Sequence, residues 1–304
     1  MSVTNLDHQA LKAATQHMGG FSWPTVILGF VCLVGYIATP YAVVTNILPL
    51  WGGAVLIAWI TYASYTVMHD AVHGAIVGRH RSLLWLQKLL GFGMGFILGF
   101  PFVGHRFEHL AHHRHTNEGE RDPDFHLGEM SRSPVAAIRS AWRLLTGQFS
   151  FYIRHQWPRA TMKDKTILVT EAFVAWGARI AFVAHGFWWE GFCLFVIASL
   201  AGLVALIYLF AYIVHRPHTE VGRYVDTSTI EFAGPANRVM TWCWLFQNYH
   251  SIHHLFPKVP FYKYKVLFDE IEPIMRAQGS PMYRLTLKGL VDTTIDDSYR
   301  KQYG

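Results

Sequence analysis

"LWGGAVLIAWITYASYTVMHDAVH", residues 50–73, begins as an apolar run and ends in two histidines spaced four positions apart. Residues 50–68 contain no charged side chain and are long enough to cross about 30 Å of hydrocarbon, which takes about 20 residues. His69 and His73 share one face of a helix, because side chains four positions apart lie one above the other. The stretch therefore predicts a membrane span that delivers two imidazoles to one membrane surface.

Three further runs have the length of a span, at roughly 24–44, 166–186 and 190–214. The composition agrees, with 52% hydrophobic and 15% charged residues, whereas soluble domains carry about 25% charged residues. A fifth run, 83–104, is broken by five glycines and by Pro101, and we expect it at the interface or against the bundle. We predict an all-α membrane protein with four transmembrane helices, folded as a single membrane-embedded domain over residues 1–304.

The orientation follows from the basic residues in the loops. Connections 45–50 and 187–189 contain no Lys or Arg, whereas 105–165 contains ten and the tail after 214 contains eleven. Cytoplasmic loops carry this excess, so both termini and the large loop are predicted to be cytoplasmic. The net charge of +6 then reflects topology, and we expect no nucleic-acid partner.

The two ends of the chain give weaker signals. Residues 1–20 lack the basic and apolar regions of a secretory signal, and we expect a short tail before the first span. After Pro260, "FYKYKVLFDEIEPIM" (261–275) predicts an amphipathic helix lying on the membrane surface.

Three histidine clusters stand out: HDAVH (69–73), HLAHH (109–113) and HSIHH (250–254). Positions three and four apart share a helix face, and all three clusters fall on the cytoplasmic side, so we expect them in a helical cap there. Packing eight imidazoles together is unfavourable unless they bind a cation, and neutral imidazole is the commonest metal ligand. The other histidines are expected to be structural or solvated: His8, His17, His80, His126, His155 and His185.

The number of imidazoles limits the choice of metal. A zinc site uses three or four protein ligands, so eight histidines imply two metals. HDAVH resembles the zinc motif HExxH, with Asp70 in place of the glutamate, but a single zinc would leave two clusters without a purpose. Bis-histidine haem needs ligands facing each other from mid-span. Carboxylate di-iron proteins use Glu-x-x-His, which is absent here. An all-histidine di-iron centre that activates O2 remains.

Two other classes fit less well. A metal transporter would need polar residues along a path inside the spans, and 24–44 and 50–68 contain no acidic residue or histidine. Cys32, Cys193 and Cys243 lie in apolar stretches with no metal-binding or redox spacing, so we expect them to be inert.

The three clusters resemble, in order and spacing, the histidine boxes of the membrane fatty acid desaturase and hydroxylase superfamily, over roughly residues 65–262. "HHRHTNEGERDPDF" (112–125) and "QNYHSIHHLFPKVPFYKY" (247–264) are similar to the carotenoid ring hydroxylases and ketolases. "YIVHRPH" (212–218) is similar to their YLPHRP element, although Ile-Val replaces Leu-Pro. The resemblance implies a ninth ligand after the last span, which makes His215 the candidate and His218 its rival.

The resemblance also assigns the site residues. It implies as iron ligands His69, His73, His109, His112, His113, His215, His250, His253 and His254. His105 and His115 are further ligands or partners of the ligands. We expect side chains that orient imidazole N–H groups among Asp70, Asp122, Asp124 and Asn248.

The implied reaction is O2-dependent oxidation of unactivated C–H bonds in an apolar lipid that enters from the bilayer, with hydroxylation of a β-carotene-type ring as the favoured outcome. Acyl-lipid desaturation at the same two iron ions is the alternative. Electrons must come from a ferredoxin-like or cytochrome-type donor, since the chain has no redox domain of its own. Basic residues in 121–165 either receive an acidic donor or only face lipid headgroups. The glycine-rich stretch 91–104 either lets a lipid substrate approach the helices closely or lets the helices pack through small residues.

Overall fold

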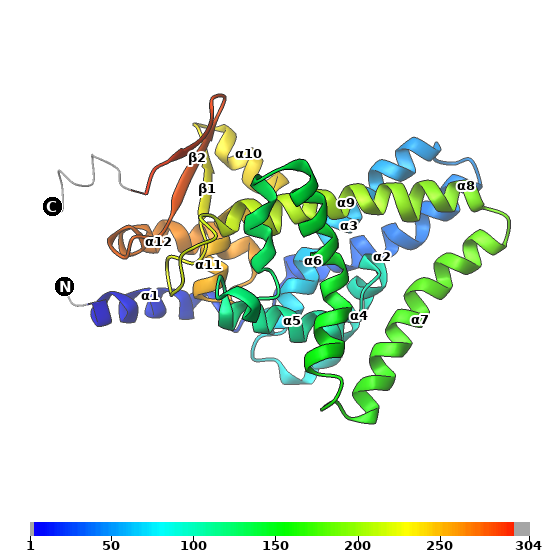
Figure 1. Ribbon diagram of the computed structural model, residues 1–304, viewed down its shortest axis with the longest axis horizontal. Coiled ribbons are helices and arrows are strands. Elements are labelled where there is room, and N and C mark those ends of the chain that lie inside the picture. The colour runs from blue at the N-terminus through cyan, green and yellow to red at the C-terminus, as the bar shows by residue number, and fades with distance from the viewer. Residues whose placement is uncertain (1–2, 295–304) are drawn as a thin grey trace.

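Four long helices dominate the computed structural model, which describes residues 3–294. Helices α2 (Trp23–Val44) and α3 (Leu50–His73) form one hairpin, and α7 (Met162–Ala184) forms a second with the helical stretch Trp188–His215. All four are long and apolar enough to cross a membrane, as the sequence predicts. The turns of both hairpins lie at one end of the molecule (Figure 1). At the other end lie α1 (Val3–His17), α11 (His250–Leu255) and α12 (Tyr264–Ala277).

The fourth span changes its winding along its length. It runs through α8 (Trp188–Gly191), the π-helical η4 (Phe192–Ala198), α9 (Ser199–Leu206), the π-helical η5 (Ile207–Tyr212) and the 3₁₀ turn η6 (Ile213–His215). Short π-helical segments are rare and concentrate at functional sites. The second of them, η5, lies directly before the turn that ends on His215.

Large apolar side chains cover the outside of these helices. Phe173 and Ile180 on α7 are 76% and 66% exposed, and Ile37 on α2 is 67% exposed. Soluble monomers rarely expose apolar patches of this extent, because water solvates them poorly. The outward faces are therefore built for contact with lipid.

The glycine-rich run does not form a straight span. Following η1 (Arg81–Leu83), α4 (Leu84–Leu98) and α5 (Phe102–His115) meet at an angle of 96°. Gly99 has φ +80°, a left-handed conformation that favours glycine, and Pro101 precedes the first residue of α5. The bend keeps the second histidine cluster, on α5, at the same end of the molecule as the first.

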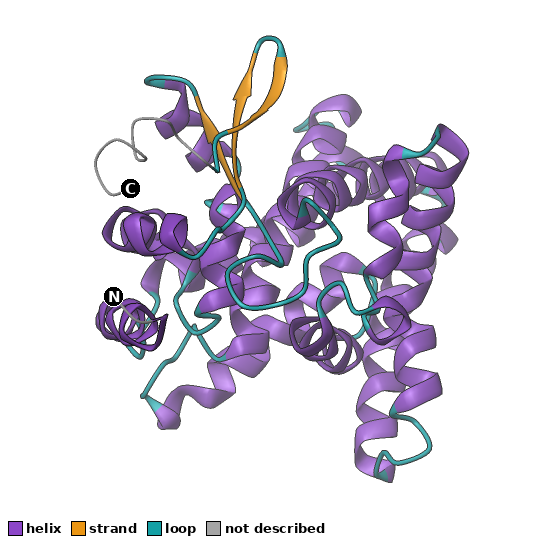
Figure 2. Ribbon diagram, turned by 60° about the vertical axis from the view of Figure 1, so that its left-hand side comes forward, coloured by secondary structure: helices purple, strands orange, loops and turns teal. Residues whose placement is uncertain are grey.

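The remaining elements surround that end. They are η2 (Gly119–Arg121), η3 (Phe125–Ser131), α6 (Pro134–His155), β1 (Thr229–Phe232), α10 (Ala236–Cys243), η7 (Gln247–Tyr249), α11 (His250–Leu255), η8 (Phe261–Lys263), α12 (Tyr264–Ala277), β2 (Met282–Thr286) and β3 (Gly289–Asp292). Strand β2 pairs in parallel with β1 and antiparallel with β3 (Figure 2). The all-α prediction therefore missed a small sheet, whose strands of four or five residues are too short for a clear alternating pattern.

Both weak signals from the chain ends need correction. Val3–His17 form helix α1 instead of a tail, with Ala10 and Ala14 fully buried and His17 within 2.9 Å of Glu270 on α12. Helix α12 is amphipathic as predicted, but its apolar face packs into the protein core and not onto a membrane surface: Leu267 and Phe268 are buried. The prediction that the C-terminus is cytoplasmic concerns residues 295–304, which lie outside the described part of the chain.

Candidate metal centre

Nine histidines from four separate elements converge at the end of the helical bundle. Helix α3 contributes two, α5 contributes three, η6 contributes one and α11 contributes three: His69, His73, His109, His112, His113, His215, His250, His253 and His254. The rings are in close contact, with centroids 3.8 Å apart for His69 and His253 and 4.3 Å apart for His113 and His254. These are the residues that the resemblance assigned as ligands, including His215.

Eight of the nine fall into two sets by the positions of their ring nitrogens. The five-histidine group contains His69, His73, His109, His113 and His253, and the three-histidine group contains His112, His215 and His254. Within each group one nitrogen per residue lies within 4.8 Å of all the others, as around a metal ion. His250 lies beside the three-histidine group, with its ring 4.8 Å from that of His215 and 4.9 Å from that of His254.

The spacing of the ring nitrogens fits a bound cation. Nε2 of His112 lies 3.0 Å from Nε2 of His215, and Nε2 of His253 lies 2.8 Å from Nε2 of His113. Two metal–imidazole bonds of about 2.1 Å at a right angle place their nitrogens about 3.0 Å apart. Both nitrogens of His69 and Nε2 of His254 are buried with no hydrogen-bond partner. Buried polar atoms without partners are costly, and a bound metal would satisfy them.

The three-histidine group has anionic support. Nδ1 of His112 lies 2.8 Å from the buried carboxylate of Asp122, Nδ1 of His254 lies 3.7 Å from Asp226, and Nδ1 of His215 lies 2.5 Å from the carbonyl oxygen of Ala211. An imidazole that donates its Nδ1 proton outward presents Nε2 to the metal, which fixes tautomer and orientation.

Asp122 and Asp124 also change the proton affinity of His112. Burial alone lowers the pKa of His112, but the neighbouring carboxylates outweigh it and raise the pKa to about 9. Asp122 is itself held by the backbone N–H groups of Asn117 and Asp124, and Asp124 lies 3.7 Å from Nδ1 of His112. A field that stabilises a proton on this ring equally stabilises a metal cation.

Two outer partners were missed from the sequence. Asp226 lies in "TEVGRYVDTST" (219–229), a stretch with no recognised motif, and Tyr264 was given no role although it lies in the motif 247–264 and in the predicted amphipathic helix. The Tyr264 hydroxyl lies 3.0 Å from Nδ1 of His253, from the five-histidine group. Nothing in the local pattern indicates either contact, since each joins segments that meet only in the folded chain.

Two of the residues expected to orient imidazole groups instead form hydrogen bonds that join separate segments of the chain. Asp70 accepts hydrogen bonds from Thr25 on α2 and from the backbone N–H of Phe261, so it ties α3 to two other segments. Within the described residues it forms no hydrogen bond or ion pair with a ligand candidate. Asn248 donates to the carbonyl oxygen of Ile230 and to Thr241, which joins α10 and β1 to the third cluster.

The additional histidines lie outside both groups. Nδ1 of His115 lies 2.9 Å from Glu118, and its side chain is 35% exposed. His218 has φ +69° and stacks on Tyr212, so His215 and not His218 faces the other rings. Nδ1 of His105 lies 2.7 Å from Gln148, and its ring stacks on His109 at 5.4 Å. His105 is thus a neighbour of the five-histidine group.

A small enclosed cavity of about 30 Å³ lies beside His109. His105, Glu108 and Gln148 line one part, and apolar side chains of the fourth span, such as Leu206 and Phe210, line another. Burial raises the pKa of Glu108 to about 8, so this carboxyl group is neutral near pH 7. His109 of the five-histidine group and these apolar side chains therefore face the same cavity.

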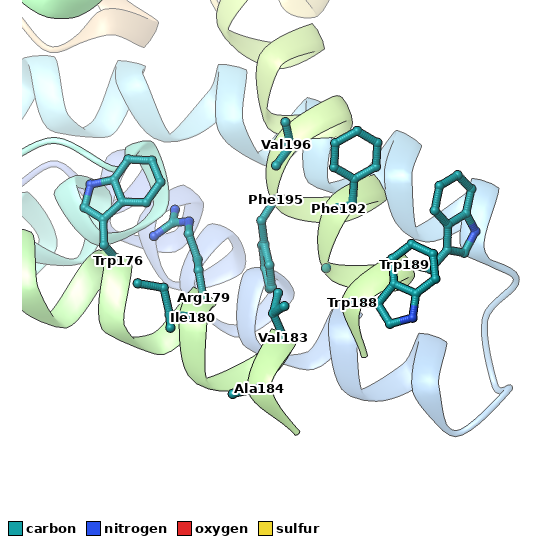
Figure 3. Close-up of a pocket in the computed structure, with 11 residues that line it drawn as sticks. Trp176, Arg179, Ile180, Val183, Ala184, Trp188, Trp189, Phe192, Phe195 and Val196 are labelled. Atoms are coloured by element: carbon teal, nitrogen blue, oxygen red, sulfur yellow. The ribbon is translucent and has the colours of Figure 1, made fainter. Parts of the chain in front are cut away.

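Helix α7 carries no ligand candidate but holds the bend between α4 and α5. The guanidinium of Arg179 donates to the carbonyl oxygens of Phe96 and Ile97 at the end of α4, at 2.9 and 2.8 Å. The indole of Trp176 donates to the carbonyl oxygen of Gly99 at 3.1 Å. Both side chains also line a lipid-facing cavity of about 680 Å³ between α7 and the fourth span (Figure 3).

The same helix caps the start of α5. The carboxylate of Glu171 accepts hydrogen bonds from the backbone N–H groups of Phe102 and Val103 at 3.1 and 3.3 Å. A cation at the carboxyl end of α4 and an anion at the amino end of α5 both complement the helix dipoles. Because α5 supplies ligand candidates to both groups, this clamp fixes the spacing of the whole centre.

Comparison with known proteins agrees with this arrangement. A model of the fatty acid desaturase family matches residues 45–286. A β-carotene ketolase of a Paracoccus species is 26% identical over 74% of this chain and 79% of its own length. A fatty acid desaturase of Bacillus subtilis is 26% identical over 69% of this chain and 64% of its own, and a fatty acid conjugase of Calendula officinalis is 20% identical over 89% and 83%. The chain belongs to the fatty acid desaturase family.

Proposed function

We propose that the protein is a membrane oxidoreductase that uses two iron ions and O2 to oxidise a ring methylene group of a carotenoid to a ketone. The observation that carries this proposal is the division of the histidines into two groups of metal-ligand geometry. Iron suits the reaction, because a C–H bond in an apolar ring has neither a leaving group nor usable acidity, and O2 activation by reduced iron supplies the oxidising power.

The side chains divide the work between the two ions. The five-histidine group would hold one ion, and the three-histidine group with His250 would hold the other. Asp122, Asp226 and the carbonyl of Ala211 keep protons on Nδ1, so Nε2 stays free for the metal. Burial of His69 and His253 keeps water away from the reacting atoms.

The ketone is favoured over the alcohol by the relatives. The sequence resemblance left hydroxylases and ketolases together, and hydroxylation was expected. However, the Paracoccus enzyme described above and two further carotenoid enzymes that match this chain are all named ketolases. A methylene group, two O2, four electrons and four protons give a ketone and three water molecules, through two successive hydroxylations at one carbon. The substrate enters from the bilayer, the centre faces the cytoplasm, and an external donor supplies the electrons.

Acyl-lipid desaturation is the second candidate. The Bacillus subtilis desaturase matches at the same 26% identity as the Paracoccus ketolase, and the same ligands serve both reactions. The cavity beside His109, with a volume of about 30 Å³, would have to widen for either substrate.

Pigment and lipid analysis of an expression host separates the two. The full-length chain is produced in a bacterial host that makes β-carotene, with His215→Ala as the matched inactive control. We expect keto groups on the pigment rings only in the strain that produces the unaltered protein. New double bonds in acyl chains would establish the second candidate instead. Unchanged pigments and lipids, despite two bound irons per chain, would overturn both substrates.

A further inference from the structure

Two basic hollows open at the histidine-bearing end of the molecule. The His73 hollow has a volume of about 480 Å³ and is lined by His73, Arg79, Arg81 and Lys258, with smaller residues between them. The His115 hollow has a volume of about 680 Å³, and its polar lining contains Arg114, His115, Glu120, Arg121, Arg154, His155, Gln156 and Arg159. The two hollows differ in their positions relative to the metal centre and in how far their charges are paired.

The His73 hollow contains unneutralised positive charge. Arg79 and Arg81 follow α3, Lys258 follows α11, and all three are exposed. None forms an ion pair within the described residues, and no acidic side chain lines the hollow. In the His115 hollow, by contrast, Glu120 is part of the wall and Arg121 lies 3.7 Å from Glu118.

The wall of the His73 hollow is itself part of the candidate metal centre. The ring of His73 lies 4.6 Å from that of His113 and 4.7 Å from that of His253, within the five-histidine group. His115, in the other hollow, belongs to neither group and faces Glu118. An electron that arrives in the His73 hollow therefore meets a ligand candidate directly, and one that arrives in the His115 hollow does not.

We propose that the His73 hollow is the docking site of an acidic, one-electron, ferredoxin-like donor, whose carboxylates contact Arg79, Arg81 and Lys258 and whose electron enters through His73. The inference rests on the proposed function and moves the donor away from 121–165, where the basic residues first suggested it. Each encounter oxidises the donor by one electron and reduces one iron ion by one, so two encounters supply each O2. Opposite charges across such a contact accelerate association strongly.

Charge reversal tests the site. The variant R79E/R81E/K258E is compared with R79K/R81K/K258R, which keeps the charge, and with R114E/R154E/R159E in the other hollow. Each full-length protein is loaded with iron in nanodiscs of neutral phosphatidylcholine. Reduced plant-type ferredoxin serves as the donor probe, and dithionite serves as a small chemical reductant. Stopped-flow absorbance follows reduction of the ferric centre, so the readout does not need a substrate.

The expected results separate docking from chemistry. We expect the second-order rate with ferredoxin to fall about tenfold or more in R79E/R81E/K258E and to lose most of its salt dependence, while dithionite reduction is unchanged. The charge-keeping variant and the variant of the other hollow should stay within about twofold of the unaltered protein.

Three outcomes would overturn the inference. An equal loss in both charge-reversal variants would mean that overall charge and not the His73 hollow guides the donor. Unchanged ferredoxin rates together with weaker binding to vesicles containing phosphatidylglycerol would make the hollow a lipid headgroup site. A larger loss in R114E/R154E/R159E would place the donor at the His115 hollow. If the iron is reduced as expected but no substrate is oxidised, the docking site stands and the proposed function fails.

Discussion

The two histidine groups differ in what stands behind their rings. In the three-histidine group every residue faces a carboxylate or a carbonyl through Nδ1: Asp122, Asp226 or Ala211. In the five-histidine group, among the described residues, His253 has an outer partner in the neutral hydroxyl of Tyr264, and the other rings contact histidines and aromatic side chains such as Phe210. The five-histidine group has more imidazoles, whereas each imidazole of the three-histidine group has a carboxylate or carbonyl partner.

Because of this difference, two ions bound in these groups would not be equivalent. Carboxylates behind an imidazole raise its basicity and hold its orientation, so a few well-supported ligands can bind as firmly as several unsupported ones. The five-histidine group also borders the small cavity through His109 and the His73 hollow through His73. An ion in this group would lie nearest to the proposed donor path, and an ion in the three-histidine group would be the more firmly held.

Removal of one imidazole from each group gives the largest expected contrast. His215→Ala takes one of few ligands away from the three-histidine group, so we expect about one iron per chain and no measurable oxidation. His69→Ala leaves four imidazoles in the other group, enough for a complete tetrahedral set, and should keep more iron than His215→Ala. Metal analysis of the purified proteins measures this, with His126→Ala as a control outside both groups. Equal iron loss in the two variants would remove the distinction between the groups.

Loss of anionic support should act on one group alone. Asp122→Asn keeps the size of the side chain but weakens the contact with His112, and we expect a loss of about 10-fold to 100-fold in affinity for one of the two irons. Competition with a chelator, followed as iron released per chain, checks the number. Asp226→Asn should cost less, because its carboxylate lies 3.7 Å away instead of 2.8 Å. A uniform loss of both irons would contradict the assignment of Asp122.

The clamp on α7 should affect both groups together. Arg179→Met leaves two carbonyl oxygens of α4 without a donor, which costs about 1–3 kcal/mol of unfolding free energy. Since α5 supplies both groups, both irons should bind more weakly. Thermal unfolding in detergent measures the stability, with the exposed Lys163→Met on the same helix as control. Selective loss of a single iron would show that the bend does not control the spacing of the centre.

The smallest effect is expected at Tyr264. Tyr264→Phe removes a neutral hydrogen bond to one of five ligands, worth about 0.5–1.5 kcal/mol. The affinity for one of the two irons should therefore fall by a few-fold. The same chelator competition applies, with Tyr262→Phe as the neighbouring control. A loss as large as that of Asp122→Asn would mean that the five-histidine group depends on outer partners as much as the other does.

The sequence predicts the parts of this centre that repeat at helical spacing. Spans of 20 apolar residues and histidines three or four apart are local patterns, so α3, α5, α11 and their rings could be expected from the chain alone. His215 needed a resemblance to a family, because a lone histidine has no periodicity. The division into two groups, with His112 and His113 facing different sets, depends on how α5 is rotated in the bundle.

Contacts between distant segments could not be predicted. Asp226 and Tyr264 contact histidines of α11 from outside that helix, and Asp70 joins α3 to other segments although its position inside HDAVH suggested the metal. The bend at Gly99 was visible as broken hydropathy, but its clamp by Glu171 and Arg179 lies about 70 to 80 residues further along the chain. Tertiary partners of this kind leave no local pattern to read.

The most direct test of the two unequal sites is Mössbauer spectroscopy of the full-length protein loaded with isotopically enriched ferrous iron. We predict two irons per chain and two quadrupole doublets of equal area, of which Asp122→Asn alters or removes one. A single doublet from two irons would contradict the inequality of the groups. One iron per chain, or none, would contradict the di-iron centre itself.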